Sequence, residues 1–496
     1  MKFKIKWSKK SKKQRQVSLL SLLITHHTIS SENFMELIEA GREGIFASTD
    51  SKYSYAIFGR DSIEVAEDLL GSHRQLARDV IITLASLQGV GLNLQSEEEP
   101  GKIHHEYRSR YFEGQRISDQ SAKILSDLQQ LWGSDGKNEM VYYGSYDATP
   151  LFIRLVGRYT DKYGDDILKE EYTGRDNKRH PIGHSVEDAE QWLVDKINCS
   201  PLGLLEYKQL NPKGIANQVW KDSETSYIHL DGSLANHNRG IASVELQGYA
   251  YDALKVAAKF SKSAPEREKF LNMAERIQKT VMEKFWLPSE DFFAEGLDYD
   301  DKGNSRQIKT LCSNGGVLLE SRLLRDLPKE VSAKYIQGVA RQLCGSQFLT
   351  PAGIRSRALK HKDLPWFIDY HGSYTVWPKE AYDIAKGLRN FGFNDLAEQL
   401  ENRILASVRV AGEFYEFFYV DEDNKLYYEK DEVQRFLKLK RSKDSPLPQK
   451  GQAWVISAVL GIEDQRARPQ TPAEAGGFES SLLAKTPLVE PVLNAR

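Results

Sequence analysis

Repeated amphipathic segments are the feature that most constrains the fold of this chain. In the stretch from Glu245 to Phe260, Leu246, Tyr249, Ala253 and Ala257 recur at helical spacing. Residues 267–286 continue with the same period. Similar segments lie near residues 31–45, 61–71, 74–88, 147–163, 185–197, 313–325, 330–343, 376–391, 394–409 and 452–462. The pattern predicts about twelve helices.

These predicted helices fall roughly into pairs, with long connections rich in Gly, Asn, Asp and aromatic residues. The connections span residues 92–118, 164–183, 199–240, 286–312 and 344–375. Loops of that length are uncommon unless they serve a function. Paired helices with long loops predict an all-α fold, an (α/α)6 barrel in which six inner helices are ringed by six outer ones. A helical solenoid is the structural rival, but no fixed repeat supports it.

Composition narrows the classes of function. The 496 residues carry 68 Lys and Arg against 70 Asp and Glu, so no basic excess favours nucleic acid as a partner. No run of about 18 apolar residues predicts a membrane span. The three cysteines, Cys199, Cys312 and Cys344, are widely spaced, which favours a reducing compartment and a cytoplasmic location.

The two ends differ in composition from the rest of the chain. Residues 1–30 open with eight Lys or Arg within the first 16 residues, and we expect a basic, flexible segment rather than a signal peptide. Residues 465–496 are rich in Pro, Ala and Gly without a period, so we expect a disordered tail. A single domain over residues 31–464 is therefore predicted.

Two short polar patches precede the middle of the chain. Arg60 and Asp61 open a helix, where they either bind sugar hydroxyl groups or, with Ser62, simply cap the helix. His105 and Glu106 are adjacent, which suggests a metal site, but the HExxH spacing is missing and a plain polar loop is the alternative. We therefore predict no metal.

Two further patches supply carboxylates beside aromatic rings. Trp220, Lys221 and Asp222 lie together in a long loop, which is either functional or a solvated polar loop. In residues 413–419, strand alternation would place Glu416 on one face with two phenylalanines. A carboxylate in aromatic surroundings is costly unless it is hydrogen-bonded or functional, the alternative being an exposed edge strand.

Two carboxylates on separate loops, with aromatic surroundings, suggest glycoside hydrolysis. One acid protonates the leaving oxygen, and the other either activates water or attacks the sugar. Other templates fail: the segment from Gly89 lacks the third glycine of a dinucleotide fingerprint, and neither a phosphate-binding loop nor a GxSxG motif occurs. Lys309 stands where a calcium loop beginning at Asp298 needs a glutamate. No cofactor is predicted.

Taken together, these patches resemble the amylo-α-1,6-glucosidase (glycogen debranching) C-terminal domain family, within the six-hairpin glycosidase superfamily. The matching strings follow the order of the family over about residues 45–460. They are Gly59-Arg-Asp-Ser62, Gly101-Lys-Ile-His-His-Glu106, Tyr142-Tyr-Gly-Ser-Tyr-Asp-Ala-Thr-Pro150, Asn217-Gln-Val-Trp-Lys-Asp-Ser223, Glu245-Leu-Gln-Gly-Tyr249, Cys312-Ser-Asn-Gly315, Tyr370-His-Gly-Ser-Tyr-Thr-Val-Trp-Pro378 and Gln452-Ala-Trp454.

The resemblance implies an (α/α)6 barrel and an inverting glycosidase that acts on an α-glucosidic bond of a carbohydrate. It implies Asp222 as general acid and Glu416 as general base, with Glu413 as the competitor for the base. An inverting pair should lie about 6.5–9.5 Å apart. Lys221 should point away from Asp222, toward substrate or another acid, so that Asp222 can hold its proton. The residues expected to bind substrate are Arg60, Asp61, His105, Glu106, Asp147, Trp220, Lys221, His371 and Trp377.

Some departures leave alternatives open. Family members often carry an N-terminal β-sandwich, and debranching enzymes of the two-activity type also carry a transferase barrel. We expect neither domain in this sequence. Lys379 and Glu380 stand where many relatives have His and Asp, which could alter the substrate beyond the first sugar. The alternatives are hydrolysis of a small glucoside or mannoside such as a glycosylglycerate, a non-catalytic sugar-binding protein, and an epimerase or lyase with His or Tyr at the floor of the cleft.

Overall fold

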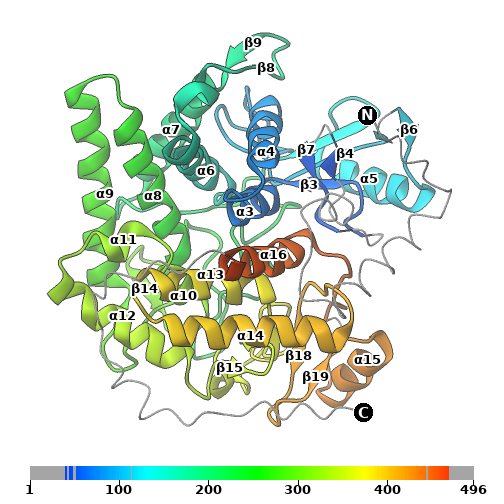
Figure 1. The fold of residues 1–496 in the computed structure, drawn as a ribbon, viewed down its shortest axis with the longest axis vertical. Coiled ribbons are helices and arrows are strands. Elements are labelled where there is room, and N and C mark those ends of the chain that lie inside the picture. The colour runs from blue at the N-terminus through cyan, green and yellow to red at the C-terminus, as the bar shows by residue number, and fades with distance from the viewer. Residues whose placement is uncertain (1–39, 42–43, 49–51, 113, 443–444, 468–496) are drawn as a thin grey trace.

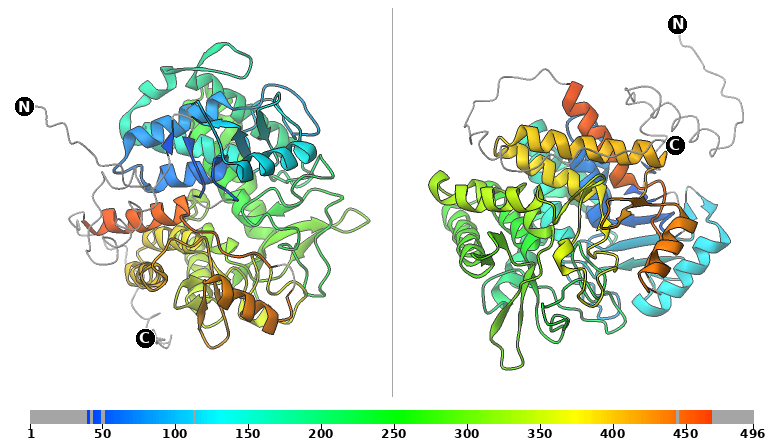
Figure 2. Two further views of the ribbon diagram at one scale, coloured as in Figure 1. Left: turned by 90° about the vertical axis from the view of Figure 1, so that its right-hand side faces the viewer. Right: turned by 90° about the horizontal axis from the view of Figure 1, so that it is seen from below.

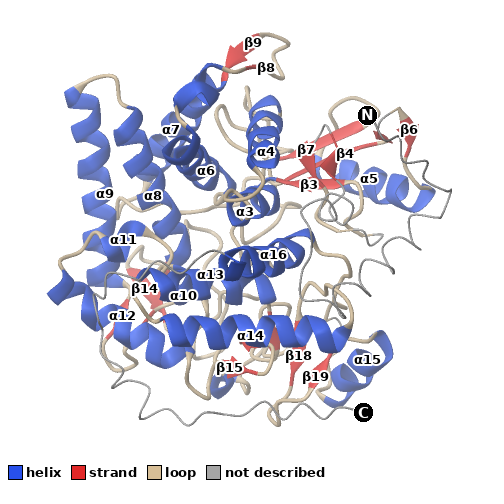
Figure 3. Cartoon of the chain, viewed as in Figure 1, coloured by secondary structure: helices blue, strands red, loops and turns tan. Residues whose placement is uncertain are grey.

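The computed structural model describes residues 40–41, 44–48, 52–112, 114–442 and 445–467. Helices dominate these residues, and the strands are short (Figure 3). The predicted all-α (α/α)6 fold is confirmed. The predicted basic segment 1–30 and most of the predicted tail lie outside the described residues.

An inner ring of helices forms the wall of the barrel. Its members are α3 (Gly59–Asp68), α6 (Ala148–Tyr163), α8 (Val244–Phe260), α10 (Asn314–Val317), α13 (Pro378–Asn390) and α16 (Ala453–Ala467). Each packs against the next, and α16 packs against α3 and closes the ring. Inner helices should be apolar on nearly all sides, and in α16 all the residues from Ala453 to Ile462 are buried.

Outer helices pack against the inner ring and bury a single stripe each. They are α4 (Arg74–Ser86), α7 (Ile182–Cys199), α9 (Ala264–Lys284), α11 (Arg322–Arg325), α12 (Lys329–Leu343) and α14 (Asn394–Ala411). In α9 the buried residues Phe270, Met273, Ile277 and Val281 recur at helical spacing. Its N-terminus is capped by Ser263, whose side chain accepts from the Glu266 amide. The remaining helices, α5 (Asp119–Trp132) and α15 (Lys430–Leu439), lie outside this ring.

The last inner helix joins the two ends of the barrel sequence. α16 lies between α3 and α13 in Figures 1 and 2. Ser457 of α16 donates to Asp68 of α3 at 2.9 Å, across a separation of 389 residues. Gln452 pairs as an isolated bridge with Ser48, which brings the two chain ends of the barrel to the same edge.

Three small antiparallel sheets lead into inner helices. They are β3 (Ala56–Phe58), β4 (Glu106–Ser109) and β7 (Glu139–Tyr142); β10 (Ala242–Ser243), β13 (Gly296–Tyr299) and β14 (Ser305–Ile308); and β17 (Thr375–Val376), β18 (Phe418–Val420) and β19 (Leu426–Tyr427). α3 begins directly after β3, α8 after β10, and α13 two residues after β17. The sheets therefore fix the N-terminal ends of these inner helices at one end of the barrel.

Two-stranded pairs and short 3₁₀ turns occupy the other connections. They are β1 (Ala40–Gly41) with β2 (Gly44–Ile45), β5 (Tyr111–Phe112) with β6 (Gln115–Arg116), β8 (Glu171–Thr173) with β9 (Arg179–Pro181), β11 (Trp286–Leu287) with β12 (Phe292–Phe293), β15 (Leu349–Thr350) with β16 (Gly353–Ile354), η1 (Asp165–Lys169) and η2 (Leu359–His361). The long predicted loops are thus mostly ordered by local strand pairing, except for residues 199–240, which contain only isolated bridges.

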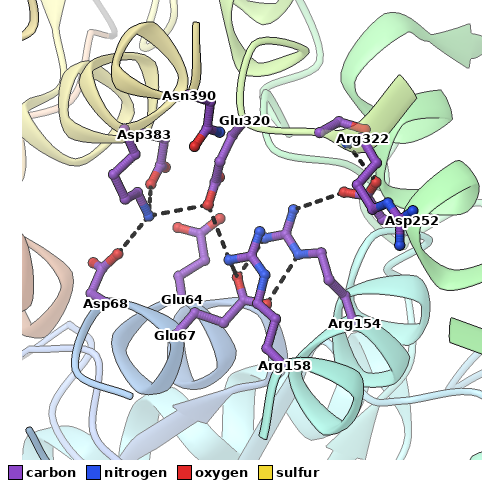
Figure 4. Close-up of polar contacts among 12 residues, drawn as sticks. Glu64, Glu67, Asp68, Arg154, Arg158, Asp252, Glu320, Arg322, Asp383 and Asn390 are labelled. Atoms are coloured by element: carbon purple, nitrogen blue, oxygen red, sulfur yellow. Dashed lines mark hydrogen bonds and ion pairs between the residues drawn. The ribbon is translucent and has the colours of Figure 1, made fainter. Parts of the chain in front are cut away.

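A network of mostly buried ion pairs joins the inner helices α3, α6, α8 and α13 (Figure 4). Its members, called the ion network below, are Glu64, Glu67, Asp68, Arg154, Arg158, Asp252, Glu320, Lys379, Asp383 and Lys386. Arg154 and Arg158 of α6 both reach Glu67 of α3, at 2.5 and 3.1 Å. These contacts tie neighbouring inner helices together through charge.

Several local predictions were wrong. The helix predicted for 31–45 ends, where it is described, in the strand pair β1 and β2. The helix predicted for 313–325 is broken into α10 and α11, and Ser321 caps the new helix start of α11. Gly316, inside α10, packs so closely on Leu343 that an added Cβ would lie at 2.5 Å. Residues 413–417 are irregular, and only Phe418–Val420 forms a strand. α16 continues to Ala467, into the predicted tail.

Candidate active site

A cavity opens at the end of the barrel where the three small sheets lead into the N-terminal ends of inner helices. It is lined by Ala47, Tyr53, Phe58, Arg60, Asp61, Trp220, Asp222, Tyr370, His371, Trp377, Glu416, Gln452 and Trp454. Arg60 and Asp61 come from the first turn of α3, Trp377 immediately precedes α13, and Trp454 opens α16. Asp222 and Glu416 come from separate connections. Segments far apart in the sequence therefore meet in one small site.

Asp222 has its carboxyl group partly open to this cavity, with 27% of its side chain exposed. The nearest cation is Arg60, whose Nη2 lies 3.6 Å from Oδ2 of Asp222. Burial raises the pKa of Asp222 to about 6, although Arg60 acts in the opposite direction. A carboxyl group with such a pKa can carry a proton close to neutral pH.

The residues around Asp222 are held by the barrel wall. The buried Lys221 ammonium donates to Ser313 Oγ at 2.8 Å and to the Ser356 carbonyl at 2.6 Å. It also lies 3.7 Å from Glu380. Lys221 therefore points toward another acid, as predicted. Trp220 Nε1 donates to the same Glu380 carboxylate at 3.1 Å.

The unusual pair Lys379 and Glu380 supports the cavity without lining it. Lys379 is buried in the ion network, where its ammonium reaches Asp68 and Asp383. Glu380 holds Trp220 and Lys221 in place. The expected effect on sugars beyond the first is therefore not supported, since both side chains face the interior of the barrel.

Glu416 is buried, so it is not on the exposed edge strand that was the alternative. Tyr370 donates a short hydrogen bond from its hydroxyl to Glu416 Oε1, and the Gln449 amide donates to Oε2 at 3.3 Å. Burial raises the pKa of Glu416 to about 7, and the Tyr370 hydrogen bond limits the rise. Glu413 does not line the cavity and instead accepts from the Phe414 amide.

Asp61 is a third carboxyl group in the cavity. Burial raises its pKa to about 7, partly offset by Arg60. Its Oδ1 atom is buried and has no hydrogen-bond partner among the described residues. The same holds for both side-chain polar atoms of Gln452 and for Nε1 of Trp454. Buried polar atoms without partners are costly, so these groups are suited to bind hydroxyl groups of a ligand.

Aromatic rings form most of the cavity wall. Trp220 meets Trp377 and Trp454 edge to face, with centroids 5.3 and 5.1 Å apart. His371 stacks on Trp377 at 5.1 Å. Flat apolar faces next to unpartnered polar atoms are the surface that a sugar ring requires, because its C–H faces pack on rings while its hydroxyl groups need donors and acceptors.

Four of the predicted substrate-binding residues do not line the cavity. His105 packs edge to face on Phe58 with centroids 5.3 Å apart, and Glu106 pairs with Arg108 through a short contact. Asp147 is fully buried behind Arg60, and Lys221 is fully buried behind Trp220. The predicted residues that do line it are Arg60, Asp61, Trp220, Asp222, His371, Trp377 and Glu416.

A comparison with known protein families shows to which family the chain belongs. The family model for amylo-alpha-1,6-glucosidase matches residues 134–382, about half of the chain. The chain belongs to this family. A periplasmic trehalase from Salmonella typhimurium is 22% identical over 329 residues, covering 59% of this chain and 54% of the trehalase. A Salmonella paratyphi C periplasmic trehalase matches to the same extent. The chain thus spans about half the length of these curated relatives.

Solved structures share the fold at low sequence identity. A glycosidase is 12% identical with a TM-score of 0.55, covering 91% of this chain and 97% of that chain. A GH63 mannosylglycerate hydrolase from Thermus thermophilus, in complex with glucose, is 14% identical with a TM-score of 0.53 and covers 87% and 99%. These likenesses show the six-hairpin fold, and the family is one of glycoside hydrolases.

The sequence prediction missed several lining residues. Tyr370, Gln452 and Trp454 belong to the strings that carry the family resemblance, but no role was inferred for them. Each could have been suspected, because each lies beside or within a motif that also contains a predicted site residue or a helix start. Tyr53 has no such signal, since it stands in an irregular segment before β3.

A second and larger cavity, of about 500 Å³, lies between α7 and the loop after α4. Its acids already have partners: Asp176 contacts His180, Asp188 contacts His184, Glu99 contacts two lysines, and Asp195 accepts a hydrogen bond from Gln191. These pairs give this cavity no carboxyl arrangement comparable with Asp222 and Glu416.

Three properties of the described residues complete the picture. No group of three or more His, Cys, Asp or Glu side chains in the described ranges is placed to hold a metal ion. Cys199, Cys312 and Cys344 are all free thiols. None of the helices in the described part of the chain is long and apolar enough to cross a membrane.

Proposed function

We propose that the protein is an inverting glycoside hydrolase that cleaves an α-glucosidic bond, with Asp222 as general acid and Glu416 as general base. The observation that carries this proposal is the cavity itself. Two carboxyl groups with pKa values raised to about 6 and 7 share it with stacked aromatic rings and buried polar atoms that lack partners. Membership of a glycoside hydrolase family supports the reaction class.

In the first half of the reaction, protonated Asp222 donates its proton to the glycosidic oxygen. The C1–O bond breaks, and the leaving sugar or aglycone departs as an alcohol. Asp222 is then a carboxylate, which Arg60 stabilises from 3.6 Å. Arg60 thus stabilises the Asp222 carboxylate formed by the proton transfer more strongly than it stabilises the neutral acid.

On the opposite face of the sugar, ionised Glu416 accepts a proton from water, whose oxygen bonds to C1. The configuration at C1 inverts because water arrives opposite the leaving group. The hydrogen bond from Tyr370 stabilises the ionised form of Glu416 and fixes the orientation of its carboxylate. After the reaction, Glu416 passes its proton to solvent and Asp222 regains one.

The substrate class follows from the lining and the family. The cavity offers one internal cation, Arg60, which carboxylates already surround, so it suits an uncharged sugar at the cleaved residue. We propose an α-glucan branch point, an α-1,6 bond, as the natural linkage, because the family is named for this activity.

A small panel of substrates tests this proposal. Purified protein is incubated with isomaltose, maltose, trehalose and a limit dextrin, and the first product anomer is followed by proton NMR. Release of β-glucose from isomaltose or limit dextrin is the expected result. Release of α-glucose overturns inversion. An isomerised or unsaturated sugar product overturns hydrolysis and favours an epimerase or lyase. Substrates that all remain intact also overturn hydrolysis and favour a non-catalytic sugar-binding protein.

A small glycoside with an anionic aglycone, such as a glycosylglycerate, is the second candidate. Lys52 favours it, because its ammonium lies over the ring of the cavity residue Tyr53, 4.7 Å from the centroid. Lys52 is exposed, and its charge opposes the rise caused by burial in the pKa of both Asp222 and Glu416. An exposed cation at that position can meet a carboxylate on the leaving group.

The Lys52→Ala variant separates the two candidates. If the natural aglycone is anionic, kcat/KM for glucosylglycerate or mannosylglycerate should fall about 10-fold while that for a neutral α-glucoside changes little. Equal effects on both substrates, or no activity of the wild-type protein on either glycerate, would exclude the second candidate.

A further inference from the structure

Asp147 is a buried carboxylate beside the active site that no substrate can reach. It directly precedes α6 and its side chain is fully buried. Although it stands at the N-cap position, its side chain makes no capping hydrogen bond. Instead, Oδ1 accepts from Ser145 Oγ at 2.6 Å and Oδ2 accepts from Arg60 Nη1 at 2.8 Å. One oxygen therefore holds Arg60, while Ser145 fixes the other.

Arg60 joins this hidden carboxylate to the cavity. While Nη1 bonds Asp147, Nη2 of the same guanidinium lies 3.6 Å from Asp222 Oδ2. Its Nε lies 3.8 Å from Asp61 Oδ1, and its plane stands over the Trp220 ring at 5.4 Å. Among the described residues, Arg60 contacts three carboxylates. The contact to Asp147 is the shortest of the three and the only hydrogen bond.

The positive charge of Arg60 beside Asp222 opposes the role of Asp222 as a general acid, and Asp147 lies where it can offset that charge. An arginine next to Asp222, with no other partner, would favour the ionised carboxylate and so remove the proton that a general acid must donate. We infer that Asp147 is a positioning residue that holds Arg60 in place and offsets its charge, so that Asp222 keeps its proton until substrate is bound. The inference rests on the proposed role of Asp222.

The electrostatic surroundings of Asp222 agree with this geometry. Burial is the largest cause of its raised pKa, Arg60 opposes the rise, and Asp147 adds to it. The charged or titratable groups that face Asp222 are Arg60 and Asp61 from α3, Asp147 at the start of α6, Lys52 before β3, and the phenols of Tyr53 and Tyr370. Of these, Asp147 is the one that is hydrogen-bonded to the arginine beside Asp222.

The test is a direct titration of Asp222 that does not depend on turnover. Protein labelled with ¹³C at the Asp side-chain carboxyl is titrated by NMR, and Asp222 is assigned from the signal missing in Asp222→Asn. In Asp147→Asn the midpoint of Asp222 should move about one pH unit lower, because Arg60 is no longer offset. In Arg60→Gln the midpoint should move higher. A midpoint in Asp147→Asn that stays within about 0.3 pH unit of wild type, or rises, overturns the inference.

Two control variants separate charge from structure. Ser145→Ala removes the other hydrogen bond to Asp147 but keeps its charge, and Glu106→Gln removes a different buried carboxylate that pairs with Arg108. Both should leave the Asp222 midpoint within about 0.3 pH unit of wild type. A shift in Glu106→Gln as large as in Asp147→Asn would mean that any buried charge has this effect, and would overturn the specific role.

If Asp147→Asn does not fold, the double variant Arg60→Gln/Asp147→Asn replaces it. Its Asp222 midpoint should lie below that of Arg60→Gln alone, since only the charge of Asp147 differs between the two. An equal or higher midpoint overturns the inference. The proposed function fails separately, if Asp222→Asn retains turnover while the titrations behave as expected.

Discussion

The barrel interior holds two groups of buried acids that differ in how many cations they meet. In the ion network, Asp68 contacts Lys379 at 3.0 Å and Lys386 at 2.7 Å. In the cavity, the one cation that Asp222 contacts among the described residues is Arg60, at 3.6 Å, and Arg60 is shared with Asp147. The same side-chain type is therefore well compensated in one region and poorly compensated in the other.

The pKa directions of Asp68 and Glu320, compared with those of the cavity acids, follow this difference. Burial alone would raise the pKa of Asp68 and of Glu320, but the lysines and arginines of the ion network outweigh it and hold both below their usual values. In the cavity, burial prevails, and the pKa values of Asp61, Asp222 and Glu416 rise. Glu64, Asp252 and Asp383 are exceptions in the network: burial raises the pKa of Glu64 to about 8 and also raises the pKa values of Asp252 and Asp383, although nearby lysines or arginines oppose the rise.

The comparison teaches that burial by itself does not mark a functional acid in this fold. An acid whose cations are close serves stability, since breaking a buried pair leaves an uncompensated charge. An acid that is buried with few partners costs stability and is retained for its reactivity. Variants of the two groups of acids should therefore differ in kind, with the largest effect expected on catalysis.

Asp222→Asn and Glu416→Gln should each lower kcat at least about 100-fold, because general acid and general base catalysis are worth about 10²–10⁴-fold each. The measurement is the initial rate on the best substrate of the panel, with folding checked by circular dichroism. Glu413→Gln is the matched control and should keep most of the rate. A larger loss in Glu413→Gln than in Glu416→Gln would move the general base to Glu413.

Asp68→Asn should lower the free energy of unfolding by about 3–5 kcal/mol, because it leaves Lys379 and Lys386 short of a buried partner. Urea unfolding followed by fluorescence measures this change. Asp161→Asn, which removes the largely exposed partner of Lys259, is the control and should change stability by less than about 1 kcal/mol. Similar losses in the free energy of unfolding of Asp68→Asn and Asp161→Asn would contradict a stabilising role of the buried ion network.

Asp222→Asn should raise the free energy of unfolding by about 1–2 kcal/mol at pH 7.5, because it removes an acid whose ionised form is disfavoured by burial. The sign depends on pH. The cost of Asp222 is complete above its folded pKa of about 6 and disappears as pH falls toward its ordinary value of 3.8. Unfolding midpoints of the variant and the wild type should therefore converge near pH 4. A destabilised variant at pH 7.5 would place Asp222 with the compensated acids.

The pH dependence of kcat/KM should be a narrow bell. Activity needs protonated Asp222 together with ionised Glu416. Because the pKa of Asp222, about 6, lies below that of Glu416, about 7, this combination is a minor protonation state whose population peaks near pH 6.5: Glu416 becomes protonated at lower pH and Asp222 ionises at higher pH. A rate profile from pH 4.5 to 9 measures it. A flat plateau from pH 5 to 8 would contradict the two raised pKa values.

The sequence predicted the inner and outer helices well, because their apolar spacing survives in local sequence. It failed where a cap or a strand pair interrupts the helical pattern. Ser321 caps a second helix start and interrupts the continuous helical pattern of residues 313–325. At the described end of the helix predicted for 31–45, β1 pairs with β2 through Gly41 and Gly44.

For the site, motifs placed most of the cavity residues but could not separate lining from support. Lys221 shares its motif with Trp220 and Asp222, which face the cavity, whereas His105, Glu106 and Asp147 belong to motifs that contribute no lining residue. Adjacent positions such as Lys221 and Asp222 differ only in the direction of the side chain, which backbone geometry in an irregular loop determines and which no periodicity reveals. Tyr53 comes from a segment with no pattern at all.

The closure of the ring by α16 has a consequence for how the chain folds. The hydrogen bond between Ser457 and Asp68 spans 389 residues, and the cavity needs Glu416, Gln452 and Trp454 as well as Arg60. During synthesis, the helix pairs near the N-terminus can pack before the last inner helix, α16, has been made. Cavity residues that they carry, such as Arg60, lack their later partners until α16 packs against α3. Contacts of such high sequence separation form late, because they close a long chain loop before they gain any stabilisation. Assembly of the active site should therefore coincide with the final step of refolding.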